Sequence, residues 1–437
     1  MSTMDQLDEV QELTWERLPA CSYLSGRAGT GKTTLIRERV EADSTYGIIG
    51  ATTGISAVNI GATTLNSLLR YFDTKSLRDS FLQGHLTRTL HALAKKHRRL
   101  IVEEVSMMDG AQLDILYRAI AEANRYKETE PMGLMLVGDF AQLPPVNASW
   151  AFEAACWPEF ARNTERLDKI WRQDDQMFIT ALNYARAGDG ASAALILDQL
   201  GVQWHSQRDL DFDGTTIVPK NDMVNRHNGM VLDEMAGPYM TLLSKRWGQQ
   251  RGEWGMNART HEWGIPPAVS LKEGAYVMCL ANAGKLRYAN GDCGHCVEID
   301  PVTGCVEVEL VRTGNVERVE PVVRDVVVYD QQHAGFRMVD EDEPRYIAEP
   351  HKRGDKYVVG QIQYSPVRLA WASTVHKSQG LTLDRAQLDF RDKFFHQPAM
   401  LYVGLSRVRT LAGLRLVGSR EQFVKACRAD VRVKEWL

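Results

Sequence analysis

The segment Gly26-Arg-Ala-Gly-Thr-Gly-Lys-Thr33 constrains the fold of this chain more than any other feature of the sequence. It matches the pattern G-x-x-x-x-G-K-[ST] at every fixed position, after an apolar run at residues 22–25 and before a helix-forming stretch. The glycines let such a loop wrap closely around a phosphate, while the backbone N–H groups and the helix start supply positive potential. We therefore expect a strand, a phosphate-binding loop and a helix in succession.

Individual positions of this loop have separate expected roles. Lys32 should reach the β- and γ-phosphates of a nucleotide, and the Thr33 hydroxyl should help to hold Mg²⁺. ATP and Mg²⁺ are thus the predicted cofactors. The other loop residues predicted to contact the nucleotide are Gly26, Gly29, Thr30, Gly31 and Thr34.

Two carboxylates, Glu103 and Glu104, end the apolar run Leu100-Ile-Val-Glu-Glu104. An acidic motif at a strand end is what a P-loop enzyme needs, because one carboxylate orients the Mg²⁺ shell and another polarises the attacking water. By position, Glu103 is predicted to take the metal role and Glu104 the water role. The alternative is an exposed acidic pair without a chemical role.

Alternating apolar and helical stretches predict an α/β fold. Between residues 20 and 150, strands are expected at 22–25, 47–52, 100–103 and 133–138, with helices starting near Lys32 and Ile55. Such alternation favours a parallel sheet with helices on both faces and functional loops at the carboxyl ends of the strands. A second alternation begins at 215–219 and resumes from Val367 to the end.

Two segments interrupt this alternation. Residues 73–99 form a polar, helix-prone insert that ends in the basic run Lys95-Lys-His-Arg-Arg99, which is either a solvated surface or a phosphate contact. Residues 231–355 contain short β-rich runs separated by Gly, Asn and Asp, which predict a small all-β barrel. The runs are 271–280, 291–300, 306–311 and 322–329.

The pair Cys293-Gly-His-Cys296 lies in one of these β-rich runs. It could be half of a zinc site or a redox pair, but the sequence has no second pair at matching spacing. Asn290-Gly291 predicts a turn just before it, so a simple strand is the favoured reading. All seven cysteines are widely spread, as is typical of reduced thiols.

Composition narrows the class of protein further. The 437 residues suggest about three domains, and 44% hydrophobic residues exclude a disordered chain. The net charge of −4 means that a nucleic-acid partner would need a local basic groove. No apolar run is long enough for a membrane helix, and the start MSTMDQLDEV lacks the features of a signal peptide. We expect a soluble, cytoplasmic protein of a bacterial or phage-infected cell, with no membrane partner.

Further segments resemble, in order along nearly the whole chain, the motifs of superfamily-one DNA helicases. Within subgroup B, the resemblance is to the group that holds RecD, Dda and the Pif-type enzymes. The most specific match is Gly138-Asp-Phe-Ala-Gln-Leu-Pro-Pro-Val146. The other matching segments are residues 7–11, 54–61, 63–67, 103–109, 167–173, 184–188, 369–384 and 401–409.

The resemblance implies two RecA-like P-loop lobes with two inserts. The first lobe would be residues 1–168, with a duplex-splitting wedge at about 73–99. The second lobe would be residues 169–230 and 356–437. An SH3-like β-barrel at 231–355 would cover the tracking strand.

The resemblance also implies the activity, an ATP-dependent DNA helicase that moves 5′→3′ on single-stranded DNA and unwinds duplex DNA. ATP would bind between Lys32 on one lobe and Arg172 and Arg407 on the other, with Arg407 as the arginine finger. Gln142 would sense the γ-phosphate, Gln11 would read adenine, and Gly380 would lie toward the nucleotide. Glu103 stands where the family usually has Asp, and with Thr33 it would hold the metal. The implied DNA-contacting residues are Thr53, Asn59, Asn66, Phe72, Pro145, Asn225, Thr374, His376 and Ser378.

Partners and alternatives follow from the same comparison. Single-stranded DNA and single/double-strand junctions are the expected partners of a monomeric motor, with replication, repair or recombination as its setting. One alternative is a nucleotide-switched DNA-binding protein or translocase that does not unwind, since Glu103 and Asn66 depart from the family pattern. The other is a generic P-loop ATPase, which would lack the motifs at 138–146 and 369–384. Phe72 and the tryptophans Trp247, Trp254 and Trp263 are either base-stacking platforms or core residues.

Overall fold

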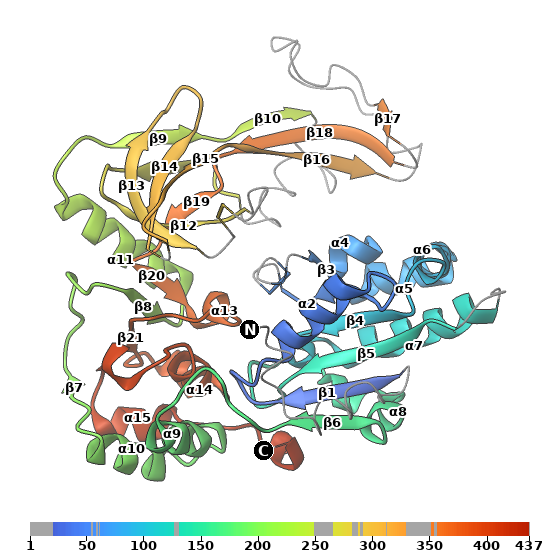
Figure 1. The fold of residues 1–437 in the computed structure, drawn as a ribbon, viewed down its shortest axis with the longest axis horizontal. Coiled ribbons are helices and arrows are strands. Elements are labelled where there is room, and N and C mark those ends of the chain that lie inside the picture. Colours follow the sequence, from blue (N-terminus) through green and yellow to red (C-terminus); the bar gives the residue numbers. More distant parts are fainter. Residues whose placement is uncertain are drawn as a thin grey trace. The chain divides into compact units, whose positions relative to one another are not determined.

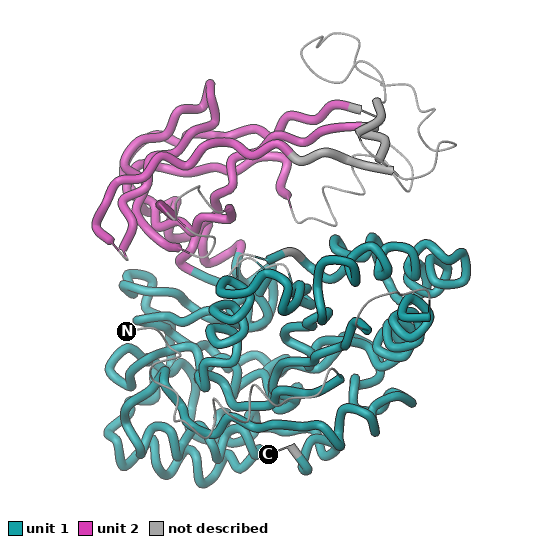
Figure 2. The backbone as a smooth tube through the Cα atoms, turned by 45° about the vertical axis from the view of Figure 1, so that its right-hand side comes forward, with its two compact units in different colours: residues 1–224, 372–437 teal, residues 225–371 magenta. Residues whose placement is uncertain are grey.

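The chain forms two compact units, which are residues 1–224 with 372–437, and residues 225–371 (Figure 2). The computed structural model describes residues 21–53, 56–57, 60, 62–125, 131–248, 265–281, 287–288, 292–311, 313–328, 351–353 and 356–436. The boundary differs from the predicted one. Strands β18 (Lys356–Tyr364) and β19 (Val367–Leu369) pair with strands of the second unit, so this unit extends to residue 371 and not only to 355.

The first lobe of unit 1 is built on a six-stranded parallel sheet of order β3-β2-β4-β5-β1-β6 (Figure 1). Apolar clusters on its two faces bury the sheet, and every residue of β5 is buried. The strands are β1 (Ser22–Gly26), β2 (Ile48–Ala51), β3 (Thr63–Thr64), β4 (Arg99–Glu103), β5 (Gly133–Gly138) and β6 (Thr164–Leu167). The helices are α2 (Lys32–Ala42), α4 (Leu65–Leu69), α5 (Thr74–Leu82), α6 (His85–Ala94), α7 (Gly110–Arg125) and α8 (Trp157–Ala161).

The predicted wedge segment is part of the first-lobe core. Helices α5 and α6 place Leu77, Leu86 and Leu90 in the same apolar cluster as α7, and all three side chains are fully buried. The apolar faces of α5 and α6 therefore pack into the lobe, and a duplex-splitting role for residues 73–99 stays a prediction. In the basic run, Arg98 pairs with Asp43 and Arg99 lies over the Tyr46 ring, which favours the surface reading.

The second lobe of unit 1 has a five-stranded parallel sheet of order β20-β8-β21-β22-β7. Both lobes thus have the predicted α/β fold. The strands are β7 (Trp204–His205), β8 (Thr215–Val218), β20 (Ala372–Thr374), β21 (Ala386–Asp389) and β22 (Leu414–Val417). The helices are α9 (Gln176–Arg186), α10 (Gly190–Gln199), α13 (Val375–Ser378), α14 (Met400–Leu405) and α15 (Arg420–Ala426). Short 3₁₀ segments lie at Val105–Met107, Ala151–Glu153, Lys393–His396, Leu411–Gly413 and Val431–Trp436.

Unit 2 consists mainly of antiparallel strands that follow α11 (Asn221–Glu234). Its largest sheet has the order β15-β14-β13-β12-β19, over an apolar cluster that includes Val277, Val306 and Leu310. The predicted β-rich character is confirmed, and the closer description as SH3-like stays a prediction. Besides β18 and β19, the strands of unit 2 are β9 (Met240–Leu243), β10 (Lys245–Gly248), β11 (Ala268–Leu271), β12 (Tyr276–Cys279), β13 (Cys293–Ile299), β14 (Val306–Leu310), β15 (Val316–Val319), β16 (Val322–Val328) and β17 (His351–Arg353).

Cys293 and Cys296 both lie on strand β13, as the strand reading predicted. Cys296 is buried, and the described residues hold no group of three or more potential metal ligands. The turn predicted at Asn290-Gly291 lies outside the described residues, as do Trp254 and Trp263. Trp247 is 4% exposed, which favours the core reading over a stacking platform. Within the part of the chain that the structure describes, no helix is long and apolar enough to cross a membrane.

Candidate nucleotide site between the two lobes of unit 1

The phosphate-binding loop connects β1 to α2 in the conformation that its glycines allow. Gly29 and Gly31 have φ values of 83° and 82°, a region that disfavours any side chain. A Cβ atom at Gly29 would lie 2.7 Å from the Arg172 Cβ, so the second half of the site approaches the loop closely. Lys32 Nζ donates to the carbonyl oxygens of Gly26 at 2.6 Å and Arg27 at 3.0 Å, which holds the ammonium group over the loop.

The two predicted carboxylates lie at the end of β4, next to the loop. The Thr33 hydroxyl donates to Glu103 Oε1, while Glu103 Oε2 is buried without a hydrogen-bond partner among the described residues. Burial, together with the charge of Glu104, raises the pKa of Glu103 to about 8. A divalent cation would stabilise the ionised form, so the Thr33 and Glu103 oxygens fit a Mg²⁺ ion.

Glu104 has a left-handed backbone conformation, with φ 57°. This conformation is uncommon for a residue with a side chain and marks a sharp change of direction after β4. Glu104 Oε2 accepts a hydrogen bond of 3.1 Å from Gln379 Nε2, and Gln379 belongs to the second lobe. The carboxylate predicted to polarise water is therefore held from across the cleft.

Arginines form the opposite wall of the site. Arg172 Nη1 donates to the Ser406 carbonyl at 2.9 Å, and burial together with the charge of Arg407 lowers the pKa of Arg172 to about 9. Arg407 is 1% exposed and donates to Val403 O at 2.8 Å and Ser406 Oγ at 2.7 Å. Burial also lowers the pKa of Arg407. The half-buried Arg172 and the buried Arg407 place two cations in one wall of the site, which favours the binding of a polyanion.

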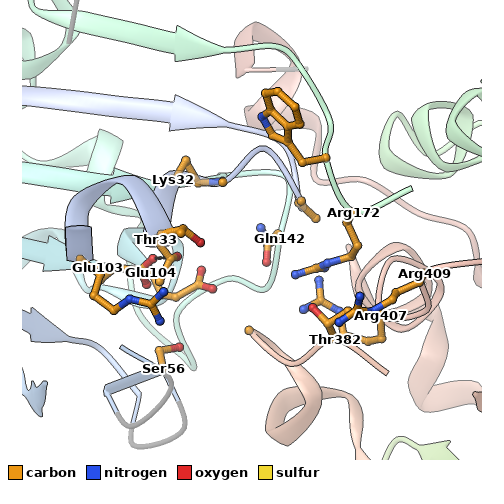
Figure 3. A pocket seen from close by; sticks show the side chains of 17 residues that line it. Lys32, Thr33, Ser56, Glu103, Glu104, Gln142, Arg172, Thr382, Arg407 and Arg409 are labelled. Atoms are coloured by element: carbon orange, nitrogen blue, oxygen red, sulfur yellow. Dashed lines mark hydrogen bonds between the residues drawn. The ribbon is translucent and has the colours of Figure 1, made fainter. Parts of the chain in front are cut away.

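A cavity of about 400 Å³ lies between these two walls. Figure 3 shows Lys32, Thr33, Glu103 and Glu104 on one side, and Arg172, Arg407, Thr382 and Arg409 on the other, with Gln142 between them. Gln142 is 4% exposed, and its Oε1 has no hydrogen-bond partner in the described part of the chain. The side chain can therefore respond to a ligand that enters the cavity.

The structure brings most of the predicted nucleotide residues together. The cavity is lined by Gly29, Gly31, Lys32, Thr33, Thr34, Glu103, Glu104, Gln142, Arg172, Gly380 and Arg407. Gly26 and Thr30 lie in the loop without lining the cavity. The Gly26 carbonyl accepts from Lys32, and the Thr30 hydroxyl donates to the Arg27 carbonyl. Gln11 lies outside the described residues.

Sequence reasoning did not predict roles for several residues at this site. Trp171 is the one aromatic side chain among the described lining residues, and its backbone N–H donates to Gly29 O at 2.8 Å. Its position directly before Arg172, a predicted nucleotide contact, could have indicated that Trp171 also lies at the site. Gln379 directly precedes Gly380, but its contact with Glu104 spans 275 positions of sequence. Arg37, Ser56, Thr382 and Arg409 also line the cavity.

The predicted DNA-contacting residues are more dispersed. Thr53 Oγ1 donates to Ser56 Oγ, Asn66 Nδ2 donates to the Phe72 carbonyl, and the Phe72 side chain is 42% exposed. His376 is half-buried, and burial lowers its pKa. Asn225 lies on α11, where unit 2 begins, and Asn59 is outside the described residues.

Three other predicted DNA-contacting residues are buried in this structure. The Ser378 side chain is fully buried, and its hydroxyl donates to the Val375 carbonyl at 2.8 Å. The Thr374 hydroxyl caps α13 by accepting from Lys377 N, and Pro145 is also buried. Thr374 and Ser378 thus stabilise α13 in this conformation, and contact of all three residues with DNA stays a prediction.

The fold and the site define a class of protein, a P-loop nucleoside triphosphatase with two parallel-sheet lobes. Residues 3–207 match the family model described as "AAA domain". The chain is 28% identical over 408 residues to ATP-dependent DNA helicase Pif1 of Bdellovibrio bacteriovorus, covering 91% of this chain and 84% of that protein. It is 28% identical to human ATP-dependent DNA helicase PIF1, of which it covers 63%. The crystal structure of Pif1 helicase from Candida albicans matches with a TM-score of 0.76 and 25% identity, over 98% of both chains.

This chain is therefore a homologue of the Pif1-type ATP-dependent DNA helicases.

Proposed function

We propose that this chain is an ATP-dependent DNA helicase that moves 5′→3′ along single-stranded DNA and separates duplex DNA. The observation that carries the proposal is the cavity lined from both lobes, with the phosphate loop on one wall and Arg172 and Arg407 on the other. A ligand that touches both walls favours the closed arrangement of the lobes, and its hydrolysis removes that preference. Such a cycle can move the lobes alternately along a bound strand.

The residues of the site divide the hydrolysis of ATP among them. Lys32 would bind the β- and γ-phosphates, and Glu104 would polarise the attacking water. Thr33 and Glu103 would hold Mg²⁺, which neutralises charge that develops on the phosphates. Arg172 and Arg407 would stabilise the transferred phosphoryl group from the second lobe. Gln142 would contact the γ-phosphate, so that its binding or loss changes the conformation of the loop that follows β5.

The base of the nucleotide has a natural neighbour in Trp171. An indole ring offers a flat apolar surface, and Trp171 lines the cavity beside Gly29 of the phosphate loop. We propose that Trp171 packs against the base, in a role separate from that of Gln11. ATP is then held at its base by one residue of the 167–173 segment and at its γ-phosphate by the next, Arg172.

Single-stranded DNA and single/double-strand junctions are the proposed partners. Among similar structures, one is described as Bacteroides Pif1 bound to single-stranded DNA and another as DNA unwinding at forked duplex DNA by two coordinating Pif1 helicases. For this chain, the candidate contacts are Thr53, Asn59, Asn66, Phe72, Pro145, Asn225, Thr374, His376 and Ser378. A monomeric motor, with a wedge at residues 73–99, is the arrangement that we propose to test.

Strand separation is the direct test of this function. A duplex with either a 5′ or a 3′ single-stranded tail is incubated with the protein, ATP and Mg²⁺. We expect the 5′-tailed duplex alone to open, and no opening with the Lys32→Ala variant. Opening of the 3′-tailed duplex alone would contradict the polarity. Failure to open either duplex, while single strands still stimulate hydrolysis, would contradict the helicase function.

The second candidate function is a nucleotide-switched DNA-binding protein that does not unwind. The observation that favours it is Glu103, whose raised pKa leaves it largely protonated near neutral pH until a cation binds. Slow hydrolysis would then favour switching over stepping. The two functions differ in one outcome, because only the helicase separates strands while both bind single-stranded DNA in a nucleotide-dependent way.

A further inference from the structure

A buried polar contact joins the two lobes beside the phosphate-binding loop. Asp139 follows β5 of the first lobe, while Arg186 ends α9 and Tyr402 lies on α14 of the second lobe. Arg186 Nη2 donates to Asp139 Oδ1 at 2.7 Å, and Arg186 Nε donates to Asp139 Oδ2 at 3.4 Å. The Tyr402 hydroxyl donates to Asp139 Oδ2 at 3.5 Å and accepts from the Ala28 N–H at 3.3 Å. The contact thus runs from the phosphate loop, through Tyr402 and Asp139, to Arg186.

Apolar packing encloses this contact. Asp139, Arg186 and Tyr402 are 1%, 5% and 4% exposed. Ala28 and Leu143, both from the first lobe, belong to the main apolar cluster of the second lobe. Part of the interface between the lobes is therefore a shared apolar core. Such a core resists continuous deformation, because close-packed interiors transmit displacement and do not absorb it.

The charges of Asp139 and Arg186 also favour an intact contact between the two lobes. Burial alone would raise the pKa of Asp139, but the ion pair with Arg186 lowers it, so the carboxylate remains charged. Burial and the Asp139 charge raise the pKa of Tyr402 to about 12, so this hydroxyl keeps its proton and can donate. Separating a buried pair leaves an uncompensated charge, which is strongly unfavourable. Arg172 and Arg407, in contrast, donate hydrogen bonds to uncharged groups.

We propose that Asp139, Arg186 and Tyr402 are positioning residues that form a fixed fulcrum, about which the two lobes close on ATP. The inference rests on the proposed function, since a fulcrum matters only where nucleotide-driven closure acts on DNA. Asp139 lies three positions before Gln142, and Ala28 lies directly before Gly29. The contact therefore ties both loops that face the γ-phosphate to the second lobe, so a small change at the nucleotide becomes a rotation of the lobes.

Tyr402→Phe is the main test variant, because it removes only the hydroxyl group and conserves volume. Arg186→Lys keeps the charge but cannot form both hydrogen bonds to Asp139, and Arg186→Gln removes the charge. Tyr239→Phe is a matched control, since the exposed Tyr239 hydroxyl also donates to an aspartate, Asp233. Arg162→Lys is the control for the arginine, as Arg162 forms an exposed ion pair with Glu159.

Two readouts report coupling between the sites. The first is the ratio of the Kd values for labelled single-stranded DNA without and with a non-hydrolysable ATP analogue and Mg²⁺, measured by fluorescence anisotropy. The second is the number of ATP molecules hydrolysed per base pair unwound. We expect Tyr402→Phe to move both by about three- to tenfold toward weaker coupling. Arg186→Lys should retain more coupling than Arg186→Gln, and both control variants should match the wild type.

The outcomes separate this inference from simpler ones. A purely structural role would lower the melting temperature and scale both rates together, leaving the ATP consumed per base pair unchanged. Wild-type coupling in both Tyr402→Phe and Arg186→Lys would overturn the fulcrum. A wild type that separates no strands contradicts the proposed function, and the affinity ratio then still decides on the fulcrum. If the affinity of the wild type for DNA does not change when nucleotide binds, the fulcrum is also overturned. Arg186→Gln is not decisive if it fails to fold, because the other two variants carry the test.

Discussion

Lys32 is the residue on which the nucleotide site most depends. In the structure its ammonium group is held by two loop carbonyls, so the fold does not need it to balance a buried carboxylate by a direct ion pair. We expect Lys32→Ala to lower kcat for ATP hydrolysis by about a hundredfold or more while the melting temperature changes little. Steady-state hydrolysis and thermal unfolding measure the two effects. Normal turnover in this variant would contradict the site.

Arg407 should act on the transition state more than on ATP binding. Removing an arginine finger costs roughly a thousandfold or more in rate, so we expect Arg407→Ala to lower kcat far more than it raises KM. The structure adds a second expectation. Because the buried guanidinium donates to several groups of its own lobe, the variant should also lose about 1–3 kcal/mol of stability. Equal losses in kcat and nucleotide affinity would argue against the finger role.

Glu103 predicts a specific dependence of stability on pH. Its pKa is about 8 in the folded chain, above the ordinary value of 4.5, so the protonated form favours folding. The favourable contribution is present at low pH and is lost as the pH rises from about 4.5 toward 8, where the folded chain must ionise a buried group. Without Mg²⁺, the free energy of unfolding should therefore fall over this range, and Glu103→Gln should flatten the fall. Denaturant titrations at several pH values, with Glu159→Gln as an exposed control, measure it.

Among the secondary-structure elements, helix α5 of the predicted wedge segment packs into the core of the first lobe. Its Leu77 is fully buried in the first-lobe core, and Leu82 on the same helix is 76% exposed. We expect Leu77→Ala to cost about 2–5 kcal/mol of unfolding free energy, and Leu82→Ala to stay within about 0.5 kcal/mol. Chemical denaturation measures both. A Leu77→Ala variant as stable as the wild type would contradict the integration of α5 and α6 into the core of the first lobe.

The sequence pattern predicts elements best where a strand of a parallel sheet is buried on both faces. The strands near residues 22, 47, 100 and 133 appear as β1, β2, β4 and β5, because parallel strands need continuous apolar runs. The end of unit 2 was less predictable. Residues 356–369 carry apolar and polar residues that would suit either a lobe or a β-rich insert, and only the pairing of β18 and β19 assigns them.

At the scale of the whole molecule, the two lobes of unit 1 are tied together by more than the nucleotide site. The segment after α15 returns to the first lobe, where Val433 joins its core and Arg432 pairs with Glu153. We expect a non-hydrolysable ATP analogue with Mg²⁺, at one hundred times its Kd, to stabilise this unit by about 2.7 kcal/mol. Thermal unfolding with increasing ligand measures the effect. The Lys32→Ala variant should lose this stabilisation by the ligand. A rise in melting temperature that persists in the variant would indicate that the analogue binds at another site.

Local sequence patterns were enough to predict the phosphate loop, the carboxylate pair and the α/β class, because each depends on residues that are close together along the chain. Eight residues define the loop, and two neighbours define the acidic pair. Residue types and order also carried the resemblance to subgroup B helicases. Only the tertiary structure decided which distant residues complete the site. Gln379 reaches Glu104 across 275 positions and Tyr402 reaches Ala28 across 374, and Ser378 turned inward. Hydrogen-bond partners and burial at such separations follow from how the lobes pack, which no local pattern encodes.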